Sequence, residues 1–395
     1  MPALAHDLVF VSMENWDDIW RRNQFVCDEL ARRNPDRKIL FVGLPNDLSN
    51  AVRAGGFSEI LSKPKNKMGS RKNIFVTSPN KWLPNSLSVG RKINDSIFRN
   101  HVRTRMEQLG IAHPILWLNP HSAVHTVGQM GESSVIYDIT DDWTTLSQAP
   151  WLTELIRQQD QELCRRANAV VVCSRRLYEM KKPLTDHLHL IPNGVNASHY
   201  HADEDKDTMT PDAAAIIGRW KGLVVGYVGT IHPDRIDVEL LLSMAAKAPT
   251  VTWVLIGPNF LESVDMDRLS KMDNIQIVGP VSYRQVPVFM RRFDVCMTPH
   301  RITPFTESLN PIKLFEYFAV GKPVVSTPVA GFRDYPELVA LASTADEFLT
   351  AVIQAKDEMP GKRQQRLAEA DKNSWSNRVD QIEHVIGSIE LAKTK

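Results

Sequence analysis

Short runs of consecutive apolar residues alternate with helical stretches along almost the whole chain. One series of these runs occupies residues 8–12, 38–42, 115–118, 135–139, 169–173 and 188–192, and a second occupies residues 223–228, 252–256, 275–278, 295–298 and 324–327. Strands that are apolar on both faces are typical of parallel sheets covered by helices on each side. The pattern therefore predicts an α/β protein with two Rossmann-like, doubly wound domains, and with ligands at the carboxyl ends of the strands, in a cleft between the domains.

The two series are separated by a polar segment, residues 201–221, that lacks strand periodicity. A chain of 395 residues is also too long for one ordinary hydrophobic core. We expect an N-terminal acceptor-binding domain at residues 1–200 and a C-terminal nucleotide-sugar-binding domain at residues 201–371. We expect residues 372–395 to form a helix that returns to the first domain.

The composition excludes several classes of protein. A net charge of +1 argues against wholesale nucleic-acid binding. The 4 cysteines show no metal-ligand spacing, which favours a reduced, cytoplasmic location. No apolar run is long enough to span a membrane, and the N-terminus lacks the pattern of a signal peptide. We expect no metal and no cofactor, since the acidic run at residues 203–207 is typical of a solvated linker.

Residues 310–326, NPIKLFEYFAVGKPVVS, predict a short, mostly apolar helix that contains two charged residues. Asn310 is a favourable N-cap, and Pro311 suits the first helical position. Lys313 and Glu316 lie three residues apart, on one face. They could form a local ion pair of little energetic consequence, or a polar ligand site at the start of the helix.

A second candidate for ligand binding is the turn that follows the strand at residues 223–228. Gly229 and Thr230 end this strand, and His232 and Arg235 lie in the turn before the next helix. A glycine turn between a strand and a helix suits phosphate, because backbone amides and the helix dipole point toward the anion. Both charged residues could equally be exposed loop residues.

In their order along the chain, these stretches resemble the GT-B glycosyltransferases that use sugar nucleotides. The resemblance is closest to family 4-like bacterial enzymes that make exopolysaccharide, capsule and teichuronic-type polymers. It extends over nearly the whole chain through VIYDITDDW (135–143), ANAVVVCSRRL (167–177), HLIPNGVNASHY (189–200), WVLIGP (253–258), NIQIVGPVSYRQVPVFMRRFDVCMTPHR (274–301) and KNSWSNRV (372–379).

This resemblance implies a site for the donor nucleotide. Glu316 would accept hydrogen bonds from the ribose hydroxyls, and Lys313 would face the diphosphate with the free amides at the helix start. The remaining donor-site residues implied by the resemblance are Gly229, Thr230, His232, Arg235, Pro280, Val281, Arg301, Asn310, Pro311 and Ile312.

The chain also departs from the family pattern. Many retaining members carry a second glutamate where this sequence has Ser308, and many have a histidine where it has Asp141 and Asp142. The stereochemical outcome, retaining or inverting, is therefore open. Asp141 or Asp142 could be the general base of an inverting transfer, or the pair could cap a helix.

Two regions of the N-terminal domain are candidates for acceptor and membrane binding. Trp16, Arg21 and Arg22 follow the first strand and suit a sugar face or a lipid phosphate, although buried tryptophans at a helix start are an equally good interpretation. Residues 61–105 mix many lysines and arginines with apolar residues, which predicts a surface for anionic membrane or a merely solvated basic face.

The sequence thus predicts a metal-independent hexosyltransferase, peripheral on the inner face of the plasma membrane. It would move a sugar from a nucleoside diphosphate donor, UDP before GDP, to a lipid-linked glycan acceptor in cell-surface polysaccharide synthesis. The alternatives are a sugar-nucleotide 2-epimerase of the same fold, a non-catalytic partner subunit and a nucleic-acid-binding protein.

Overall fold

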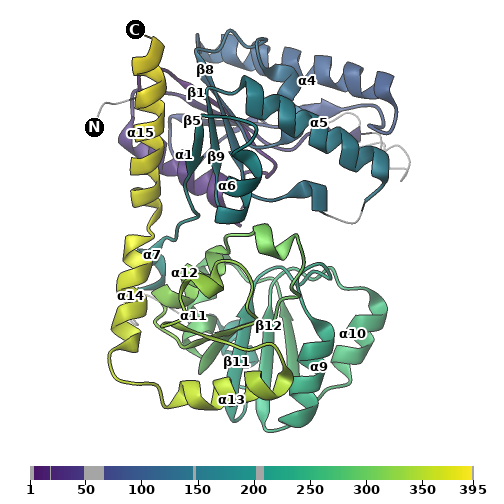
Figure 1. Ribbon diagram of the computed structural model, residues 1–395, viewed down its shortest axis with the longest axis vertical. Helices are drawn as coiled ribbons and strands as arrows, with labels where there is room; N and C mark the ends of the chain where they lie inside the picture. Colours follow the sequence, from purple (N-terminus) through teal and green to yellow (C-terminus); the bar gives the residue numbers. More distant parts are fainter. Residues whose placement is uncertain (1–3, 18, 49–65, 146–147, 202–208, 394–395) are drawn as a thin grey trace. The chain divides into compact units, whose positions relative to one another are not determined.

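The structure is a computed structural model that describes residues 4–17, 19–48, 66–145, 148–201 and 209–393. The chain forms two compact units (Figure 1). Unit 1 comprises Met1–Pro192 and Arg378–Lys395, and unit 2 comprises Asn193–Asn377. The first boundary between the units thus follows Pro192, whereas the sequence analysis placed it after residue 200. The second boundary follows Asn377, whereas the sequence analysis placed it after residue 371.

Unit 1 is built on one sheet in the order β10-β9-β8-β7-β1-β2-β5-β4. Its strands are β1 (Leu8–Val11), β2 (Ile39–Val42), β4 (Asn66–Met68), β5 (Ile74–Thr77), β7 (Ile115–Leu118), β8 (Ser134–Ile139), β9 (Ala169–Val172) and β10 (Leu188–Leu190). Only the pairing of β4 with β5 is antiparallel among the described strands of this sheet. A separate short pair joins β3 (Asn46–Asp47) to β6 (Asn80–Lys81).

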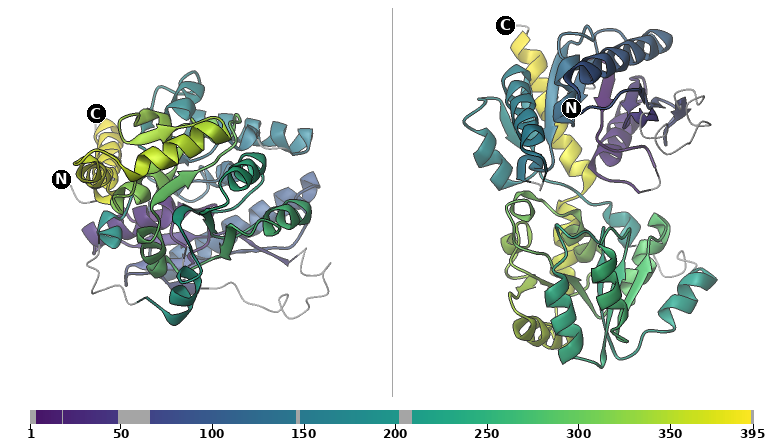
Figure 2. Two further views of the ribbon diagram at one scale, coloured as in Figure 1. Left: turned by 90° about the horizontal axis from the view of Figure 1, so that it is seen from below. Right: turned by 90° about the vertical axis from the view of Figure 1, so that its right-hand side faces the viewer.

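Helices flank the sheet of unit 1, as Figure 2 shows. They are α1 (Arg22–Arg33), α4 (Ser88–Leu109), α5 (Pro150–Arg166), α6 (Arg175–Lys181) and, from Arg378 onward, α15 (Trp375–Lys393); η1 (His121–Thr126) and η2 (Trp143–Thr145) are short 3-10 turns. The strands β1, β2, β7 and β9 are buried at every position, because they lie inside a sheet covered on both faces.

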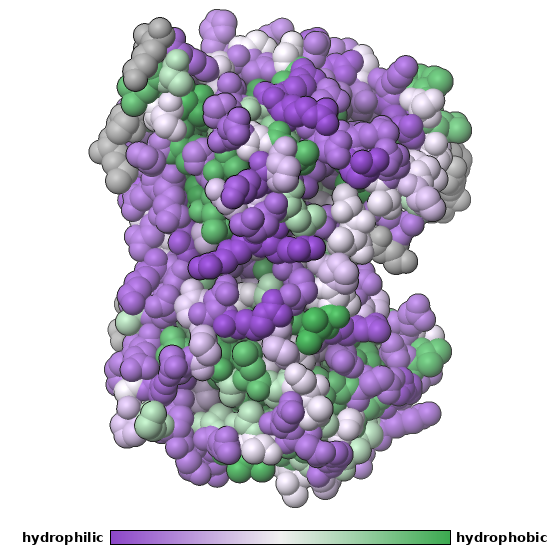
Figure 3. Space-filling view, in the orientation of Figure 1, coloured by the Kyte–Doolittle hydropathy of each residue, from purple (hydrophilic) through white to green (hydrophobic). Residues whose placement is uncertain are grey.

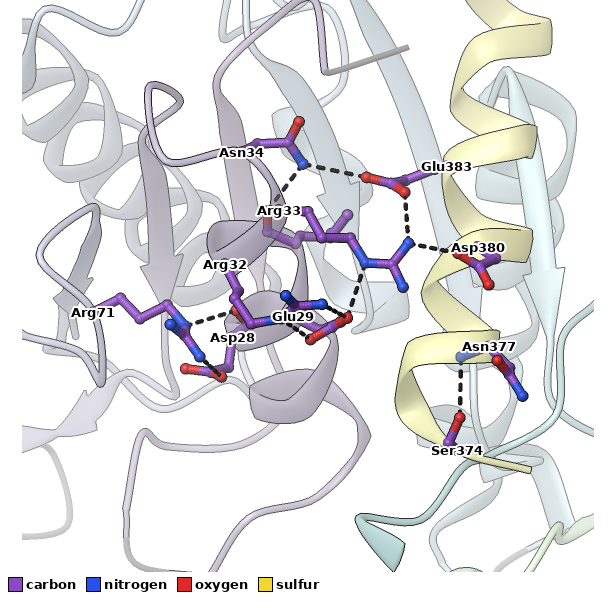
Figure 4. Close-up of polar contacts among 11 residues, drawn as sticks. Asp28, Glu29, Arg32, Arg33, Asn34, Arg71, Ser374, Asn377, Asp380 and Glu383 are labelled. Atoms are coloured by element: carbon purple, nitrogen blue, oxygen red, sulfur yellow. Dashed lines mark hydrogen bonds and ion pairs between the residues drawn. The ribbon is translucent and has the colours of Figure 1, made fainter. Parts of the chain in front are cut away.

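The C-terminal helix α15 is held in unit 1 by a cluster of ion pairs (Figure 4). Arg33, at the end of α1, directs Nη1 to Asp380 Oδ1 at 2.6 Å and to Glu383 Oε2 at 2.8 Å. Asn34 Nδ2 also donates to Glu383 Oε1 at 3.3 Å. The last part of the chain therefore belongs to the first unit by charge pairing as well as by packing.

Unit 2 contains an entirely parallel six-stranded sheet in the order β13-β12-β11-β14-β15-β16. Its strands are β11 (Leu223–Val228), β12 (Val251–Ile256), β13 (Ile275–Gly279), β14 (Val295–Thr298), β15 (Val324–Ser326) and β16 (Val339–Leu341). Around them lie α7 (Ala197–Tyr200), α8 (Pro211–Ile217), α9 (Val238–Lys247), α10 (Ser263–Ser270), α11 (Val286–Arg291), α12 (Ile312–Ala319), α13 (Ala345–Lys356) and α14 (Lys362–Lys372), with 3-10 turns η4 (Tyr283–Gln285), η5 (Thr306–Ser308) and η6 (Phe332–Asp334). Two separate apolar clusters, one around Phe293 and Phe318 and one around Trp253 and Phe348, bury the two faces of the sheet.

The predicted α/β class with two Rossmann-like domains is confirmed, and the cleft expected between them stays a prediction. The sequence analysis missed β4 and β5 at one end of the first sheet and the edge strand β16 of the second. These strands have only three, four and three residues and therefore give little periodic signal. Among the helices that the structure describes, none has the length and apolarity needed to cross a membrane.

Candidate functional site

Polar and charged side chains lie together at the start of α12 in unit 2. The helix begins at Ile312 with Pro311 as its N-cap residue, so it starts one residue later than the sequence predicted. Asn310 is not the cap, because its side-chain Oδ1 and its carbonyl oxygen accept hydrogen bonds from Asn193 N at 2.8 Å and Asn193 Nδ2 at 2.7 Å. Asn310 thus ties the segment before α12 to the turn after β10.

Lys313 and Glu316 form an ion pair of 2.6 Å between Nζ and Oε2. The local ion pair that the sequence analysis considered is therefore present. However, the Glu316 side chain is only 8% exposed, whereas that of Lys313 is 33% exposed. A carboxylate buried to this extent needs charged or hydrogen-bonding partners, so the pair is more than a surface contact.

Aromatic side chains lie around the Glu316 carboxylate. Burial raises the pKa of Tyr200 and of Tyr283, and the negative charge of Glu316 adds to both increases. The His199 ring stacks on the Tyr283 ring with centroids 4.0 Å apart. Aromatic rings therefore lie close to the Glu316 carboxylate, namely those of His199, Tyr200 and Tyr283. This combination suits a ligand that has both a polar part and a flat apolar part.

The glycine turn after β11 is packed tightly against the neighbouring strand end. Gly229 N donates to Ile256 O at 2.8 Å, and a Cβ on Gly257 would lie 2.0 Å from Gly229 O. The carbonyl of Thr230 accepts a hydrogen bond from Tyr227 Oη at 3.1 Å. Asp237 then caps α9 by accepting from Leu240 N at 3.0 Å. The strand–glycine–helix order that the sequence predicted is thus present.

The structure brings Arg235 and Arg301 together at the ends of β11 and β14. Arg301 N donates to Arg235 O at 2.7 Å, and Arg301 Nη1 donates to Pro233 O at 3.4 Å. The Arg235 guanidinium lies over the Phe305 ring, 5.6 Å from its centroid, in the segment that leads to α12. Burial lowers the pKa of His300 to about 3, and the positive charge of Arg235 adds to this effect.

The other donor-site residues are less constrained. His232 Nδ1 accepts a hydrogen bond from Asp234 N at 3.2 Å, within the same turn. Pro280 is exposed and Val281 is half-buried, directly after the end of β13 at Gly279. Whether any of these residues contacts a nucleotide stays a prediction.

In unit 1, the structure separates the roles of Asp141 and Asp142. Asp142 is 3% exposed. Its Oδ1 accepts hydrogen bonds from Thr144 N at 3.1 Å and Thr144 Oγ1 at 2.5 Å, at the start of η2. Asp141 is half-buried and accepts from Thr140 Oγ1 at 2.9 Å. Asp142 therefore caps a short helical turn, which is one of the two roles that the sequence analysis considered for the pair. Asp141 is the more accessible of the two carboxylates.

Two of the three predicted acceptor residues lie in the interior of unit 1. Arg22 is 3% exposed and pairs with the fully buried Asp138 at 2.9 Å. Trp16 is 8% exposed, and its ring packs against Trp20 and Phe41. Their burial favours the alternative that the sequence analysis left open, packing at a helix start, and acceptor binding by these residues stays a prediction. The side chain of Arg21 is the most accessible of the three, at 41%.

The sequence analysis missed Glu14, which lies in the loop after β1. Its Oε2 atom is buried and has no hydrogen-bond partner among the described residues, and its Oε1 lies 3.8 Å from Arg21 Nε. Burial raises the pKa of Glu14 to about 7; the charge of Arg21 opposes this, and the charges of Asp141 and Asp17 add to it. The available signal was a carboxylate in the loop after the first strand of a parallel sheet.

Within the described residues, no three or more His, Cys, Asp or Glu side chains are grouped so that they could hold a metal ion. Metal-independent transfer nevertheless stays a prediction.

The chain has two doubly wound units, and the second contains a buried carboxylate–lysine pair at a helix start. Solved structures show that this is the GT-B fold. Residues 222–357 match the family model of the glycosyl transferases group 1. The predicted resemblance to GT-B glycosyltransferases is therefore confirmed.

Individual proteins support the same class. Residues of this chain are 30% identical over 204 residues to the putative teichuronic acid biosynthesis glycosyltransferase TuaH of Bacillus subtilis (strain 168). That match covers 49% of this chain and 50% of the relative, so it spans about half the length of each.

Solved structures agree at the level of fold. HepE of Anabaena in complex with UDP and glucose has a TM-score of 0.68 and 15% identity, over 97% of this chain and 100% of that one. Sucrose-phosphate synthase from Thermosynechococcus elongatus has a TM-score of 0.70 and 15% identity, over 98% and 100%. At such identities the likeness concerns the fold alone.

Proposed function

We propose that this protein is a glycosyltransferase that moves a sugar from a UDP-sugar to a glycan acceptor in the synthesis of a cell-surface polysaccharide. The observation that carries the proposal is the Glu316–Lys313 pair at the start of α12, inside the segment that matches the glycosyl transferases group 1. Support for UDP comes from the name of the HepE complex, and support for the polymer comes from the name of the TuaH relative.

The chemistry of this site suits a nucleoside diphosphate. The Glu316 carboxylate has enough acceptor positions for the two vicinal hydroxyls of a ribose, and such hydrogen bonds are charge-assisted. Lys313, Arg235 and Arg301 supply positive charge for a diphosphate, together with the free amides at the start of α12. These groups would also stabilise the negative charge that develops on the departing diphosphate, so the transfer would need no metal.

A donor screen tests this proposal. We would measure thermal shifts and calorimetric affinities with UDP-, GDP- and dTDP-sugars. A ligand at one hundred times its dissociation constant adds about 2.7 kcal/mol of stability, and we expect the largest shift with UDP. If the protein released the donor's sugar as a free sugar with inverted configuration at C2, without any acceptor, the epimerase alternative would be favoured instead. Absence of binding to every nucleotide would favour the non-catalytic partner subunit.

The finer part of the proposal is a lipid-linked acceptor at the cytoplasmic face of the membrane. Its support is a patch on unit 1, here called the α4 patch, that combines exposed apolar residues with basic ones: Trp82, Leu87, Val89, Arg91, Lys92, Ile93 and Trp151. Arg91 lies 5.8 Å from the centroid of the Trp151 ring, which joins the start of α4 to the start of α5.

Exposed apolar side chains next to basic ones are typical of surfaces that bind anionic lipid. Figure 3 shows apolar residues among strongly hydrophilic ones on the visible face of unit 1. Lys63 and Lys65, which the sequence analysis included in this surface, lie outside the described residues. Lys67 and Arg71 bond within unit 1, to the Trp16 carbonyl and to Asp28, and so contribute less to such a surface.

A further inference from the structure

The sheet of unit 2 changes direction between β11 and β14. The chain runs from β11 outward to β12 and β13 on one side, and then returns to β14 on the other side of β11. Strands β11 and β14 pair in parallel at Val225 and Gly226, and both continue beyond this pairing, β11 to Val228 and β14 to Thr298. The glycine turn, residues 229–235, directly follows β11. Doubly wound sheets bind their ligands at such a point, outside the carboxyl ends of the strands.

The hydroxyl of Tyr317 lies between these two strand ends. Val228 N donates to Tyr317 Oη at 3.1 Å, and Tyr317 Oη donates to Met297 O at 3.2 Å. The fully buried hydroxyl therefore takes the place of the direct backbone pairing that joins the strands earlier. Tyr317 belongs to α12 and directly follows Glu316, so the same two hydrogen bonds also fix α12 against the ends of β11 and β14.

A second tyrosine acts on the opposite face of the sheet. Tyr317 and Tyr227 belong to the two different apolar clusters that bury the faces of this sheet. Tyr227 Oη donates to Thr230 O at 3.1 Å, inside the glycine turn, and lies 3.4 Å from His300 Nε2, in the segment after β14. A hydroxyl has one proton to donate, so His300 would be the donor in the second contact. Tyr227 thus joins the glycine turn to the segment after β14.

Backbone hydrogen bonds hold the far end of the glycine turn to the same segment. Arg301 N donates to Arg235 O at 2.7 Å, and Asp237 N donates to Pro299 O at 2.9 Å. The two strand ends are therefore joined before and after the turn, and the two tyrosine hydroxyls connect the interval between. Hydrogen bonds are directional, whereas apolar contacts are not. The hydroxyls therefore define where α12 lies relative to the glycine turn.

We infer that Tyr317 and Tyr227 are positioning residues of the proposed donor site, and that their hydroxyls hold the glycine turn in register with Glu316. The inference rests on the proposed function, in which Arg235 of the turn helps to bind the diphosphate and Glu316 binds the ribose. One nucleotide would then have to reach two separate elements at once. Sites of this kind need their groups held within about 0.5 Å of the productive geometry. A shift between the two elements weakens a ligand that contacts both more than a ligand that contacts one.

The test compares UDP with uridine on the full chain carrying Tyr317→Phe or Tyr227→Phe. Each change removes one hydroxyl and keeps the ring, so the apolar contacts remain. We expect the affinity for UDP to fall about tenfold, the size of one ordinary hydrogen bond. The affinity for uridine, which has the ribose hydroxyls but no phosphate, should stay unchanged. Calorimetry measures the binding of UDP, and ligand-observed NMR measures the binding of uridine.

Tyr137→Phe is the matched control. Tyr137 is buried in unit 1, where its Oη donates to Asp160 Oδ1 at 2.9 Å. This variant should lose stability in thermal unfolding, as both test variants should, but it should keep the wild-type ratio of UDP affinity to uridine affinity. The ratio separates positioning from stability, because a purely structural hydroxyl changes the melting temperature and leaves the ratio unchanged. Should one test variant fail to fold, the other decides by the same ratio.

Two outcomes would overturn the inference, and each hydroxyl is judged by its own ratio. In the first, the variants bind UDP as tightly as the wild type, which would limit the hydroxyls to stability. In the second, the affinities for UDP and uridine fall by the same factor, which would show a general distortion of the site. A wild type that binds no UDP refutes the proposed function and the inference with it, whereas equal UDP binding by the wild type and both variants refutes the inference alone.

Discussion

At the scale of single residues, Glu316 and Lys313 neutralise each other in the structure, at 2.6 Å. A nucleotide that used both groups would have to replace this ion pair with its own hydroxyls and phosphates. The exchange is favourable only if the new hydrogen bonds satisfy the buried Glu316 carboxylate at least as well, because an unpaired buried charge is costly.

We predict that Glu316→Ala and Lys313→Ala each weaken the binding of UDP by about 1.5–3 kcal/mol, since each removes a hydrogen bond to a charged group. Isothermal calorimetry with UDP measures this change. Lys372→Ala is the matched control, because Lys372 forms a pair with Glu369 at the same spacing in unit 2 and is 72% exposed. Unchanged affinity in both test variants would refute the nucleotide site.

A second residue-scale prediction concerns Glu29 of α1 and acid stability. Burial alone would raise the pKa of Glu29, but the hydrogen bonds from Arg32 and Arg33 outweigh this effect and lower the pKa to about 2. The folded-state value is below the ordinary value of 4.5, so the unfolded chain takes up the proton first. The stabilisation from Glu29 is therefore fully present above pH 4.5 and disappears as the pH falls toward 2.

Glu29→Gln should accordingly lower the stability of the protein at neutral pH, and the difference from the wild type should shrink as the pH falls below 4.5. Urea unfolding followed over a series of pH values measures both effects. Glu154→Gln is the control, because its ion pair with Arg157 is exposed on α5. A difference that stays constant with pH would show that Glu29 acts by packing and not by charge.

At the scale of elements, a glycine fixes the start of α12. Gly331 has φ of +82°, and a Cβ at this position would lie 2.6 Å from Pro311 Cδ, at the N-cap of α12. An alanine would thus push on the first turn of the helix that carries Lys313 and Glu316. A rigid proline ring cannot move aside as a flexible side chain can.

We predict that Gly331→Ala weakens UDP binding as well as stability. Gly361→Ala is a matched control, because Gly361 has a similar φ of +95° and nothing within 4 Å of its added Cβ. Both variants suffer the backbone strain of a positive φ, but only the first meets Pro311. Thermal unfolding and UDP calorimetry on the two variants separate strain from displacement. Equal UDP affinities would show that the start of α12 tolerates the shift.

At the scale of the whole molecule, a near-neutral chain with a net charge of +1 carries a local basic and apolar surface, the α4 patch. Leu87 and Val89 are 64% and 66% exposed there. Apolar side chains this exposed gain free energy on burial in a lipid interface, and each nearby basic residue adds about 1 kcal/mol at an anionic surface.

We predict that the protein binds vesicles with acidic lipids and that binding falls with salt, since salt screens the basic residues. Replacing Leu87, Val89 and Lys92 with serine should release it, as measured by co-sedimentation. Val264→Ser is the control for an apolar residue of unit 2 that is also 66% exposed. Tight binding of RNA or DNA at physiological salt would contradict the membrane proposal and favour the nucleic-acid alternative.

The sequence by itself determined the central strands of both sheets and the fold class. Continuous apolar runs such as residues 8–12 and 223–228, with helical stretches between them, are typical of strands in sheets that are covered on both faces, and this pattern predicted the doubly wound architecture. The same local logic located α12 and its two charges, because helix signals extend over only a few residues.

Only the tertiary structure decided which polar residues form internal contacts in the protein and are therefore unavailable to a ligand. Arg22 and Asp142 had suitable chemistry for a site, but Arg22 pairs with Asp138, far away in the sequence, and Asp142 caps η2. Glu14 had no distinguishing motif, and its raised pKa comes from burial and from Asp141, a residue of a different strand end. Partners and burial of this kind depend on contacts between distant segments, and the local pattern of a sequence does not encode them.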